Sequence, residues 1–171
     1  MSDRFYFTVY LSTSLVFAAL APAANHNPKE NSKGEPVSSH ATGAFEVKST
    51  PQPSGFKTED RNLGRMTGEK LFHGDLEATS EVQMLTAGTS IKGSAGYVAI
   101  EKITGALKGR SGTFIMQHSG TMNRGVPQLM VTVVPDSGTG QLVGLSGKMN
   151  IIISADGKHS YDFEYTLAEI H

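Results

Sequence analysis

The sequence contains no cysteine and no tryptophan, and it carries almost no net charge. Without cysteine the chain has no disulfide, no thiol nucleophile, no thiolate metal ligand and no lipid-anchored cysteine. Its 15 basic and 16 acidic residues leave a formal net charge of -1, which gives no electrostatic reason to bind the phosphates of nucleic acid. A platform for stacking bases would have to use tyrosine or phenylalanine. We therefore expect no nucleic-acid partner, and we expect packing alone to stabilise the fold.

Helical spacing is also missing from the sequence. No segment of useful length repeats its hydrophobic residues every three to four positions. The 19 glycines disfavour helices and separate short runs rich in β-branched and aromatic residues. The sequence therefore predicts an all-β domain.

One long hydrophobic run is present near the start, at residues 5–21. Arg4 precedes it, and an Ala-Pro-Ala motif ending at Ala23 follows it. We interpret residues 1–23 as a cleaved secretory signal peptide. The alternative is an uncleaved anchor, which would need about 20 apolar residues, whereas three hydroxyl side chains dilute this run. The mature protein is then expected to be periplasmic or secreted, without a stable membrane span.

The segment after the signal is polar. Residues 24–39 are rich in Asn, Pro, Lys, Glu and Ser, and they predict a disordered linker that joins the signal to a single domain at residues 40–171. The domain opens on an alternation of apolar and charged residues at 44–48, as in a strand with one wet face. A long loop is predicted at residues 49–63, and loops of that length tend to be functional or mobile.

The centre of the chain, residues 95–122, predicts two strands folded back on each other. Residues 108–112 contain the two glycines expected of a tight turn between them. Earlier, Gly74 marks either a bend between two strands or a kink in one long strand. Later, residues 156–157 (Asp-Gly) are a hairpin signal, and residues 159–167 alternate aromatic and polar side chains. Seven to nine such strands predict a closed antiparallel barrel or a sandwich.

Several motifs in this domain are similar to those of a bacterial family of unknown function. They are residues 72–77 (FHGDLE), 97–105 (YVAIEKITG), 109–114 (GRSGTF), 117–120 (QHSG) and 133–147, which ends in SGTGQLVGLSG. That family resembles the allene oxide cyclase and dirigent-like barrel superfamily. The resemblance covers about residues 41–167 and implies a single antiparallel eight-stranded β-barrel with an internal cavity. No functional residue of the cyclases can be matched to this chain.

Glu101 is the first candidate for chemistry. If the side chains of Tyr97, Ala99, Glu101 and Ile103 face the barrel interior, the Glu101 carboxylate is buried. Burial should then raise its pKa toward use as an acid or base. The alternative is an exposed carboxylate paired with Lys102 or Arg110.

His118 and Gln117 are neighbours on the second strand of the hairpin, so they point to opposite faces and only one can share the interior with Glu101. His118 is a candidate proton carrier or a structural hydrogen bonder. Gln117 and Tyr97 are candidate ligand contacts. We expect Tyr97, Glu101, Gln117 and His118 to supply the polar groups of any lumenal site.

His73 is a further candidate ligand contact. His73, Asp75 and Glu77 would share one face of a strand and resemble a metal constellation, but Gly74 should break the alternation and make a solvated bend. We predict no metal site and no cofactor.

Three functions are open at this stage. The first is binding of a small apolar molecule in the lumen, and the second is a cyclase or isomerase in which Glu101 or His118 moves a proton. The third is a structural or oligomer-forming module with a packed interior. A homo-oligomer is possible if Val98 and Ile100 lie outside, because they would expose an apolar wall.

Overall fold

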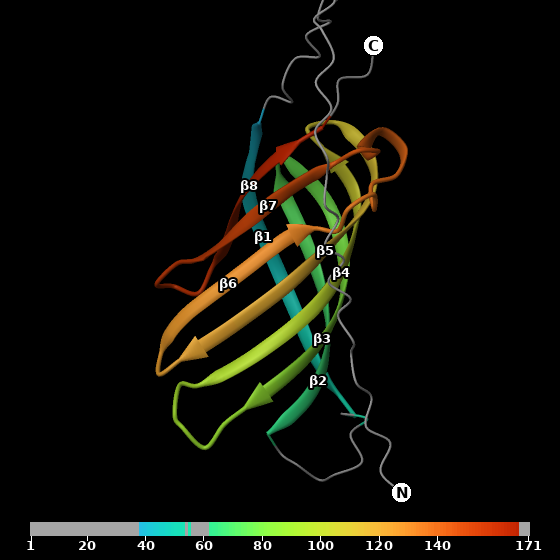
Figure 1. Cartoon of the computed structure of the whole chain (residues 1–171). Coiled ribbons are helices and arrows are strands. Elements are labelled where there is room, and N and C mark those ends of the chain that lie inside the picture. Colours follow the sequence, from blue (N-terminus) through green and yellow to red (C-terminus); the bar gives the residue numbers. More distant parts are fainter. Residues whose placement is uncertain (1–37, 54, 56–61, 168–171) are drawn as a thin grey trace, which may run out of the picture. The chain divides into compact units, whose positions relative to one another are not determined.

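In the computed structural model the described residues are 38–53, 55 and 62–167. They form one antiparallel sheet that closes on itself in the order β1-β2-β3-β4-β5-β6-β7-β8 (Figure 1). The strands are β1 (Ser39–Gln52), β2 (Leu63–Gly74), β3 (Leu76–Gly88), β4 (Ala95–Leu107), β5 (Arg110–Asn123), β6 (Val126–Val133), β7 (Ser146–Ile153) and β8 (His159–Thr166). One turn of 3-10 helix, η1 (Gly140–Leu142), lies between β6 and β7. The predicted eight-stranded barrel is confirmed, and the sandwich alternative is wrong.

Of the two units into which the chain divides, the second, Gly34–His171, contains the barrel. The predicted signal peptide and nearly all of the predicted linker lie outside the described residues. Within residues 38–53, 55 and 62–167, no helix has the length and hydrophobicity needed to cross a bilayer.

Alternation of side chains along each strand explains why the sheet closes. In β8, Tyr161, Phe163 and Tyr165 are buried while the residues between them stay partly exposed. β3, β4 and β5 show the same period of two in their buried residues. One face of every such strand must leave water, and a barrel buries all of these faces together. The predicted alternation at the C-terminal end is confirmed.

The hairpin between β4 and β5 is tighter than predicted. Its turn is Lys108 and Gly109 alone, both with positive φ (46° and 80°), as a two-residue hairpin of the primed type requires. Gly112 lies inside β5, where a Cβ would come within 2.1 Å of the carbonyl oxygen of Thr139. The second glycine therefore makes room for the connection that follows β6, and it does not build the turn.

The loop predicted to begin at Ser49 begins later. Residues Ser49 to Gln52 continue β1 and pair with Gly68 to Arg65 of β2. Beyond Phe45, the described residues show β1 paired only with β2, and an edge of this kind tolerates the missing N–H of Pro51. Pro51 therefore lies inside β1, and its interpretation as part of a loop is wrong.

Gly74 is the bend between two strands, the first of the two alternatives left open by the sequence. Its φ of 104° lies in the region that favours glycine. The next residue, Asp75, donates its N–H to the carbonyl oxygen of Thr42 at 3.0 Å and accepts the N–H of Thr42 at 2.9 Å. This exchange ties the bend to β1.

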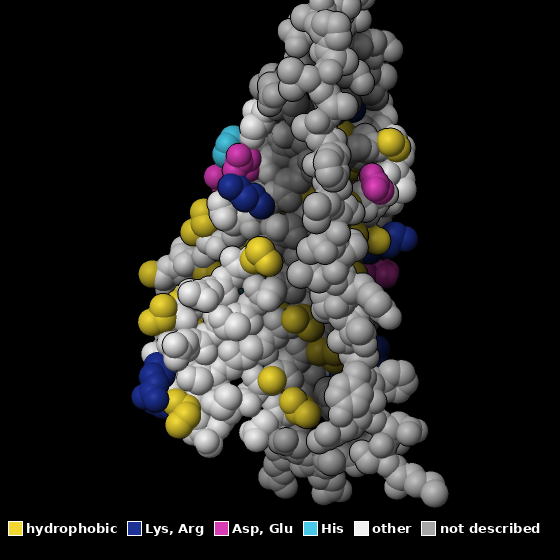
Figure 2. Space-filling model, in the orientation of Figure 1, with side chains coloured by type: hydrophobic (Ala, Val, Ile, Leu, Met, Phe, Trp, Pro, Cys, Tyr) yellow, Lys and Arg dark blue, Asp and Glu magenta, His cyan; other side chains and the backbone are white. Residues whose placement is uncertain are grey.

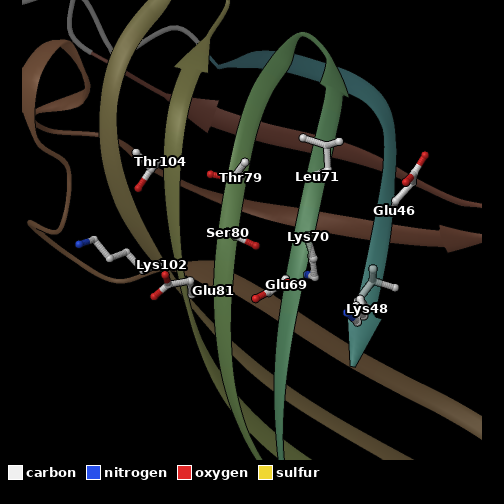
Figure 3. A pocket seen from close by; sticks show the side chains of 11 residues that line it. Glu46, Lys48, Glu69, Lys70, Leu71, Thr79, Ser80, Glu81, Lys102 and Thr104 are labelled. Carbon is white, nitrogen blue, oxygen red and sulfur yellow. The ribbon is translucent and has the colours of Figure 1, made fainter. Parts of the chain in front are cut away.

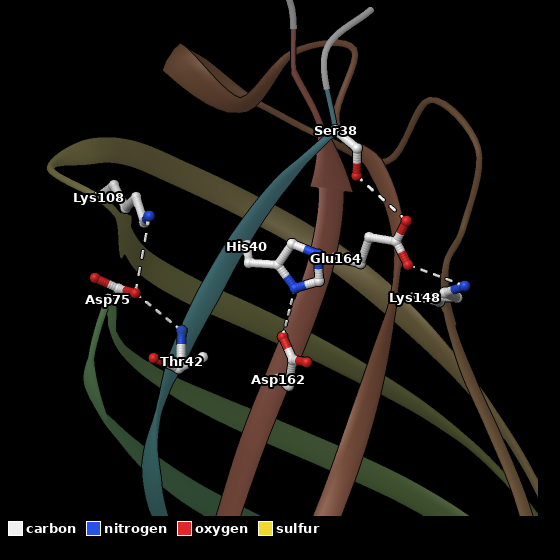
Figure 4. A network of polar contacts seen from close by, with 8 residues as sticks. All are labelled: Ser38, His40, Thr42, Asp75, Lys108, Lys148, Asp162 and Glu164. Carbon is white, nitrogen blue, oxygen red and sulfur yellow. Dashed lines mark hydrogen bonds and ion pairs between the residues drawn. The ribbon is translucent and has the colours of Figure 1, made fainter.

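Polar side chains contact one another on the outer wall near the seam where β1 meets β8 (Figure 4). His40 Nδ1 lies 2.8 Å from Asp162 Oδ1, and Ser38 Oγ donates to Glu164 Oε1 at 3.3 Å. Lys148 of β7 pairs with Glu164 at 2.9 Å. These side chains are substantially exposed, so the seam is closed mainly by the β1–β8 hydrogen-bond ladder and the core beneath it.

The core fills one end of the lumen. Phe72, Phe114 and Phe163 are at most 1% exposed, and aromatic rings from different strands, including non-adjacent ones such as β5 and β8, pack with centroids 5.2–5.9 Å apart. Leu142 and Leu145, from the connection between β6 and β7, are buried in the same cluster and close that end. The opposite end has inward-facing side chains that stay open to solvent, including Val47 (40%), Leu129 (43%) and Ile153 (63%). The barrel is therefore a cup with a filled base and an open mouth.

Candidate functional site

The open half of the lumen contains a cavity of about 190 Å³. Its walls are mainly apolar side chains, including Val47, Met66, Val82, Leu129, Ile151 and Ile153. The polar side chains that reach it include Lys70, Tyr97, His118 and His159. An apolar pocket with a few convergent polar groups is the usual form of a small-molecule site.

Glu101 lies below this cavity, 1% exposed, with Tyr97, Ala99 and Ile103 on the same face of β4. The predicted inward face of the hairpin is therefore confirmed, and the exposed alternative is wrong. Lys70 of β2 donates to Glu101 Oε2 at 2.8 Å, and Ser80 of β3 donates to Oε1 at 2.5 Å. The partner of the carboxylate is thus Lys70, and neither Lys102 nor Arg110.

The pKa of Glu101 moves in the opposite direction to the one predicted. Burial on its own would raise this pKa, but contacts from His118, Lys70 and Ser80 outweigh it and lower the pKa to about 2. Glu101 is therefore a carboxylate at neutral pH. A group this acidic neither donates a proton nor accepts one readily, so the predicted role of Glu101 in proton transfer loses its physical basis.

His118 lies inside, on β5, and is 3% exposed. Its Nε2 is 2.8 Å from Glu101 Oε2. The N–H direction is poor for a hydrogen bond, however, and within residues 38–53, 55 and 62–167 this buried nitrogen has no well-directed partner. The His118 ring therefore lies next to the Glu101 carboxylate without a well-directed hydrogen bond to it. The same ring forms part of the cavity wall.

Tyr97 lies across the neighbouring strand. A Cβ placed on Gly120 would fall 2.2 Å from the Tyr97 ring, so the missing side chain of Gly120 provides the space for that ring. Burial and the nearby charge of Glu101 raise the pKa of Tyr97, which keeps its hydroxyl protonated. The ring is part of the cavity wall, as predicted.

Sequence reasoning missed three residues of the site, Lys70, Ser80 and His159, and Lys70 is the charged one. Its side chain is 9% exposed, and its Nζ lies 5.0 Å from the centroid of the Phe45 ring and 5.6 Å from that of Phe72. A lysine among charged neighbours suggests a wet surface. The alternation of side chains along a strand could have identified it. Lys70 is two residues from the buried Phe72, so both side chains lie on the same face of β2.

Two of the predicted ligand contacts lie elsewhere. Gln117 is exposed on the outer wall, because His118 takes the inward position next to it. His73 is also outside, with its ring 3.7 Å from the Glu77 carboxylate. Neither residue can orient a molecule in the lumen.

The His73, Asp75 and Glu77 segment is a solvated bend. Gly74 donates its N–H to Glu77 Oε1 at 2.8 Å, and Asp75 pairs with Lys108 at 3.9 Å. No group of three or more His, Cys, Asp or Glu in the described part of the chain is arranged to hold a metal ion.

The outer wall carries a larger hollow of about 550 Å³ over β1 to β4 (Figure 3). Side chains opposite each other on these four strands form a row of Lys48, Glu69, Glu81 and Lys102. Two positive and two negative charges cancel along the row, and all four side chains are exposed. This arrangement is typical of a solvated strand surface.

A second hollow on the outer wall, about 320 Å³, is partly apolar. Leu85, Val98 and Ile100 line it and are 46%, 54% and 48% exposed. The prediction that Val98 and Ile100 lie outside is therefore confirmed. On the face drawn in Figure 2, hydrophobic side chains are scattered among polar ones, and charged side chains lie along both edges of that face.

Comparison with known proteins gives a family and a structural relative. A family model described as "Protein of unknown function (DUF3224)" matches residues 41–165. A crystal structure of a DUF3224 protein of unknown function from Shewanella oneidensis MR-1, at 1.84 Å resolution, is similar at 46% identity and a TM-score of 0.73. The similarity covers 78% of this chain and 100% of that chain. No curated protein matches. The resemblance to allene oxide cyclases is not shown by these matches and stays a prediction.

Proposed function

The chain belongs to the DUF3224 family of proteins of unknown function, and from the chemistry of its lumen we propose that it binds one small, mostly apolar molecule there. The observation that carries the proposal is a cavity of about 190 Å³ with apolar walls above a buried ionised cluster. A barrel that served only as a structural module would fill its lumen with its own side chains. In this barrel, side chains fill one end of the lumen and leave a cavity at the other end.

The size of the cavity limits the ligand. An engineered apolar cavity of about 150 Å³ is known to hold benzene, so the lumen suits a molecule with one ring or a short chain. The mouth is open, so a longer tail can extend past Val47 and Leu129 into solvent. The ligand class is therefore a small hydrophobic molecule with a single polar end.

A second candidate function is acid–base catalysis by His118. The specific observation is that its buried Nε2 lies 2.8 Å from a carboxylate and that the His118 side chain forms part of the cavity wall. An imidazole next to a carboxylate is a common general base. In this function His118 moves the proton and Glu101 does not.

As part of the same proposal, the protein is exported after removal of residues 1–23 and meets its ligand in the periplasm or outside the cell. Self-association through the apolar outer wall at Leu85, Val98 and Ile100 is a further proposal, since such patches favour contact with another protein surface.

Calorimetric titration with butanol, hexanol and octanol tests lumenal binding. Each added methylene should strengthen binding by about 0.8 kcal/mol until the cavity is full. The variant Val47→Trp places a large ring in the cavity and should abolish binding. Val98→Trp is the matched control, because Val98 is a valine of comparable exposure on the outer face. Equal binding by both variants, or no dependence on chain length, would contradict a lumenal site.

A further inference from the structure

The polar groups of the cavity differ in what they offer a ligand. Lys70 has three N–H donors, and one of them goes to Glu101. The Tyr97 hydroxyl has no hydrogen-bond partner among the described residues, and it faces the same cavity. The Glu101 oxygens already accept from Lys70 and Ser80. Lys70 and Tyr97 therefore both have N–H or O–H donors available to a ligand.

The charges in the cluster largely cancel. Lys70 lies 2.8 Å from the Glu101 carboxylate, which is 1% exposed. A negatively charged ligand near Lys70 would also lie near Glu101 and would lose its hydration in an apolar cavity. A positively charged ligand would compete with Lys70 for a carboxylate that already accepts from Lys70 and Ser80. An uncharged polar end avoids both costs.

We infer that the polar end of the ligand is an uncharged hydrogen-bond acceptor, a carbonyl oxygen of the ketone or ester type, which accepts from Lys70 and Tyr97. This inference rests on the proposed lumenal binding and adds the chemical class of the bound group. The remainder of the molecule contacts the apolar walls, where a second polar group would find few partners.

The test compares probes of similar length, 2-heptanone, heptanoate and heptylamine, with toluene as an apolar reference. Binding is measured by calorimetry at pH 8, where ordinary imidazoles are neutral. We expect 2-heptanone to bind at least about tenfold more tightly than heptanoate or heptylamine, because a charged end group loses its hydration in the apolar cavity. If heptanoate or heptylamine matches or exceeds the ketone, the inference is overturned.

Variants assign the effect to the named groups. Tyr97→Phe should lower the affinity for 2-heptanone relative to toluene by about fivefold. Tyr165→Phe is the control, since it removes a hydroxyl from the filled end of the lumen. Glu101→Gln should improve heptanoate binding, because it removes the repulsive charge and leaves Lys70. If Tyr97→Phe weakens the ketone and toluene equally, the hydroxyl has no role in recognition and the inference fails.

The two proposals fail in different ways. If none of the four probes binds, lumenal binding itself is wrong. If toluene binds and the ketone has no advantage over it, the lumen binds apolar molecules and only the carbonyl assignment is wrong. The Tyr97→Phe result does not depend on Glu101→Gln being able to fold.

Discussion

Glu101 keeps its charge inside the barrel because three neighbours from three other strands surround its carboxylate. Lys70, Ser80 and His118 each lie within 2.8 Å of one of its oxygens. A buried ion pair of this kind adds little net stability compared with an apolar pair of the same size, but the loss of one partner is costly. Removing Lys70 alone would therefore leave the buried Glu101 carboxylate without its counter-charge.

The lowered pKa of Glu101 predicts an acid-sensitive fold. A depressed pKa contributes stability that is present above the unfolded value near 4.5 and is lost as the pH falls toward about 2. Between pH 6 and pH 3 this group should cost the wild-type protein about 2 kcal/mol of unfolding free energy. Urea unfolding at both pH values should show that loss in wild type and in the exposed control Glu46→Gln, but much less of it in Glu101→Gln. The same loss in all three would show that Glu101 is not the acid-sensitive group.

At the scale of the element, the hairpin of β4 and β5 is the most regular part of the barrel. Its strands pair along their full length, and its turn uses two residues of positive φ. The pairing of β6 with β7 is the opposite case, because Thr132 and Lys148 are the one pair in register among the described residues. The two strands separate towards the mouth (Figure 1), next to Leu129 and Ile151 of the cavity.

The turn offers a direct test of backbone strain. Lys108→Asn should stabilise the protein by up to about 1 kcal/mol, since Asn-Gly is the preferred pair in this turn. Gly109→Ala should destabilise it by about 1 kcal/mol through its positive φ alone, because a Cβ at Gly109 meets nothing within 4 Å. Thermal unfolding of both variants measures whether Lys108→Asn is more stable, and Gly109→Ala less stable, than the wild-type protein. A Gly109→Ala protein more stable than wild type would contradict the positive φ of Gly109.

Unequal pairing of the strands predicts unequal hydrogen exchange. The backbone amides of β4 and β5 should exchange near the global unfolding limit. In Leu129 to Val131 of β6 and Ile151 to Ile153 of β7, the amides that point into the β6–β7 gap should exchange faster than those that bond to β5 or β8. Native-state exchange read by mass spectrometry or NMR measures this. Equal protection of the two pairs would mean that β6 and β7 are joined more firmly than their register shows.

At the scale of the whole molecule, the barrel depends on the first strand meeting the last. β1 pairs with β8 from Ser39 to Phe45, so the two ends of the domain close the ring. The second compact unit begins at Gly34, and the family match begins at residue 41. Everything needed for closure thus lies between β1 and β8.

This arrangement predicts where the chain can be shortened. A protein that begins at Gly34 should fold with an unchanged melting temperature, because β1 is intact. A protein that begins at Glu46 loses the whole β1–β8 ladder and should fail to fold. Circular dichroism during thermal unfolding measures both. A large loss of stability in the first truncation would show that residues 1–33 contribute to the barrel.

The sequence by itself determined the class of fold and the inward face of the central hairpin. Alternating side chains in β4 and β8 and the glycine-rich turns predict antiparallel strands, and the same parity places Glu101 inside with Val98 and Ile100 outside. These features depend on the two-residue period of a strand, which is a local property that can be read from neighbouring residues. The end of β1 and the role of Gly112 could not be predicted in this way, because they depend on contacts with β2 and with Thr139, which are distant in sequence.

Only the tertiary structure decided the chemistry of the lumen. Lys70, Ser80, Glu101 and His118 come from four different strands, and the pairing of β2, β3, β4 and β5 side by side brings their side chains to one point. The sign of the Glu101 pKa shift follows from that meeting, because burial alone would have raised the value and the neighbours reverse it. Which half of the lumen is filled also depends on long-range packing, since Leu142 and Leu145 return from the β6–β7 connection to close the base. A pattern along one strand carries no information about a neighbour that lies dozens of residues away.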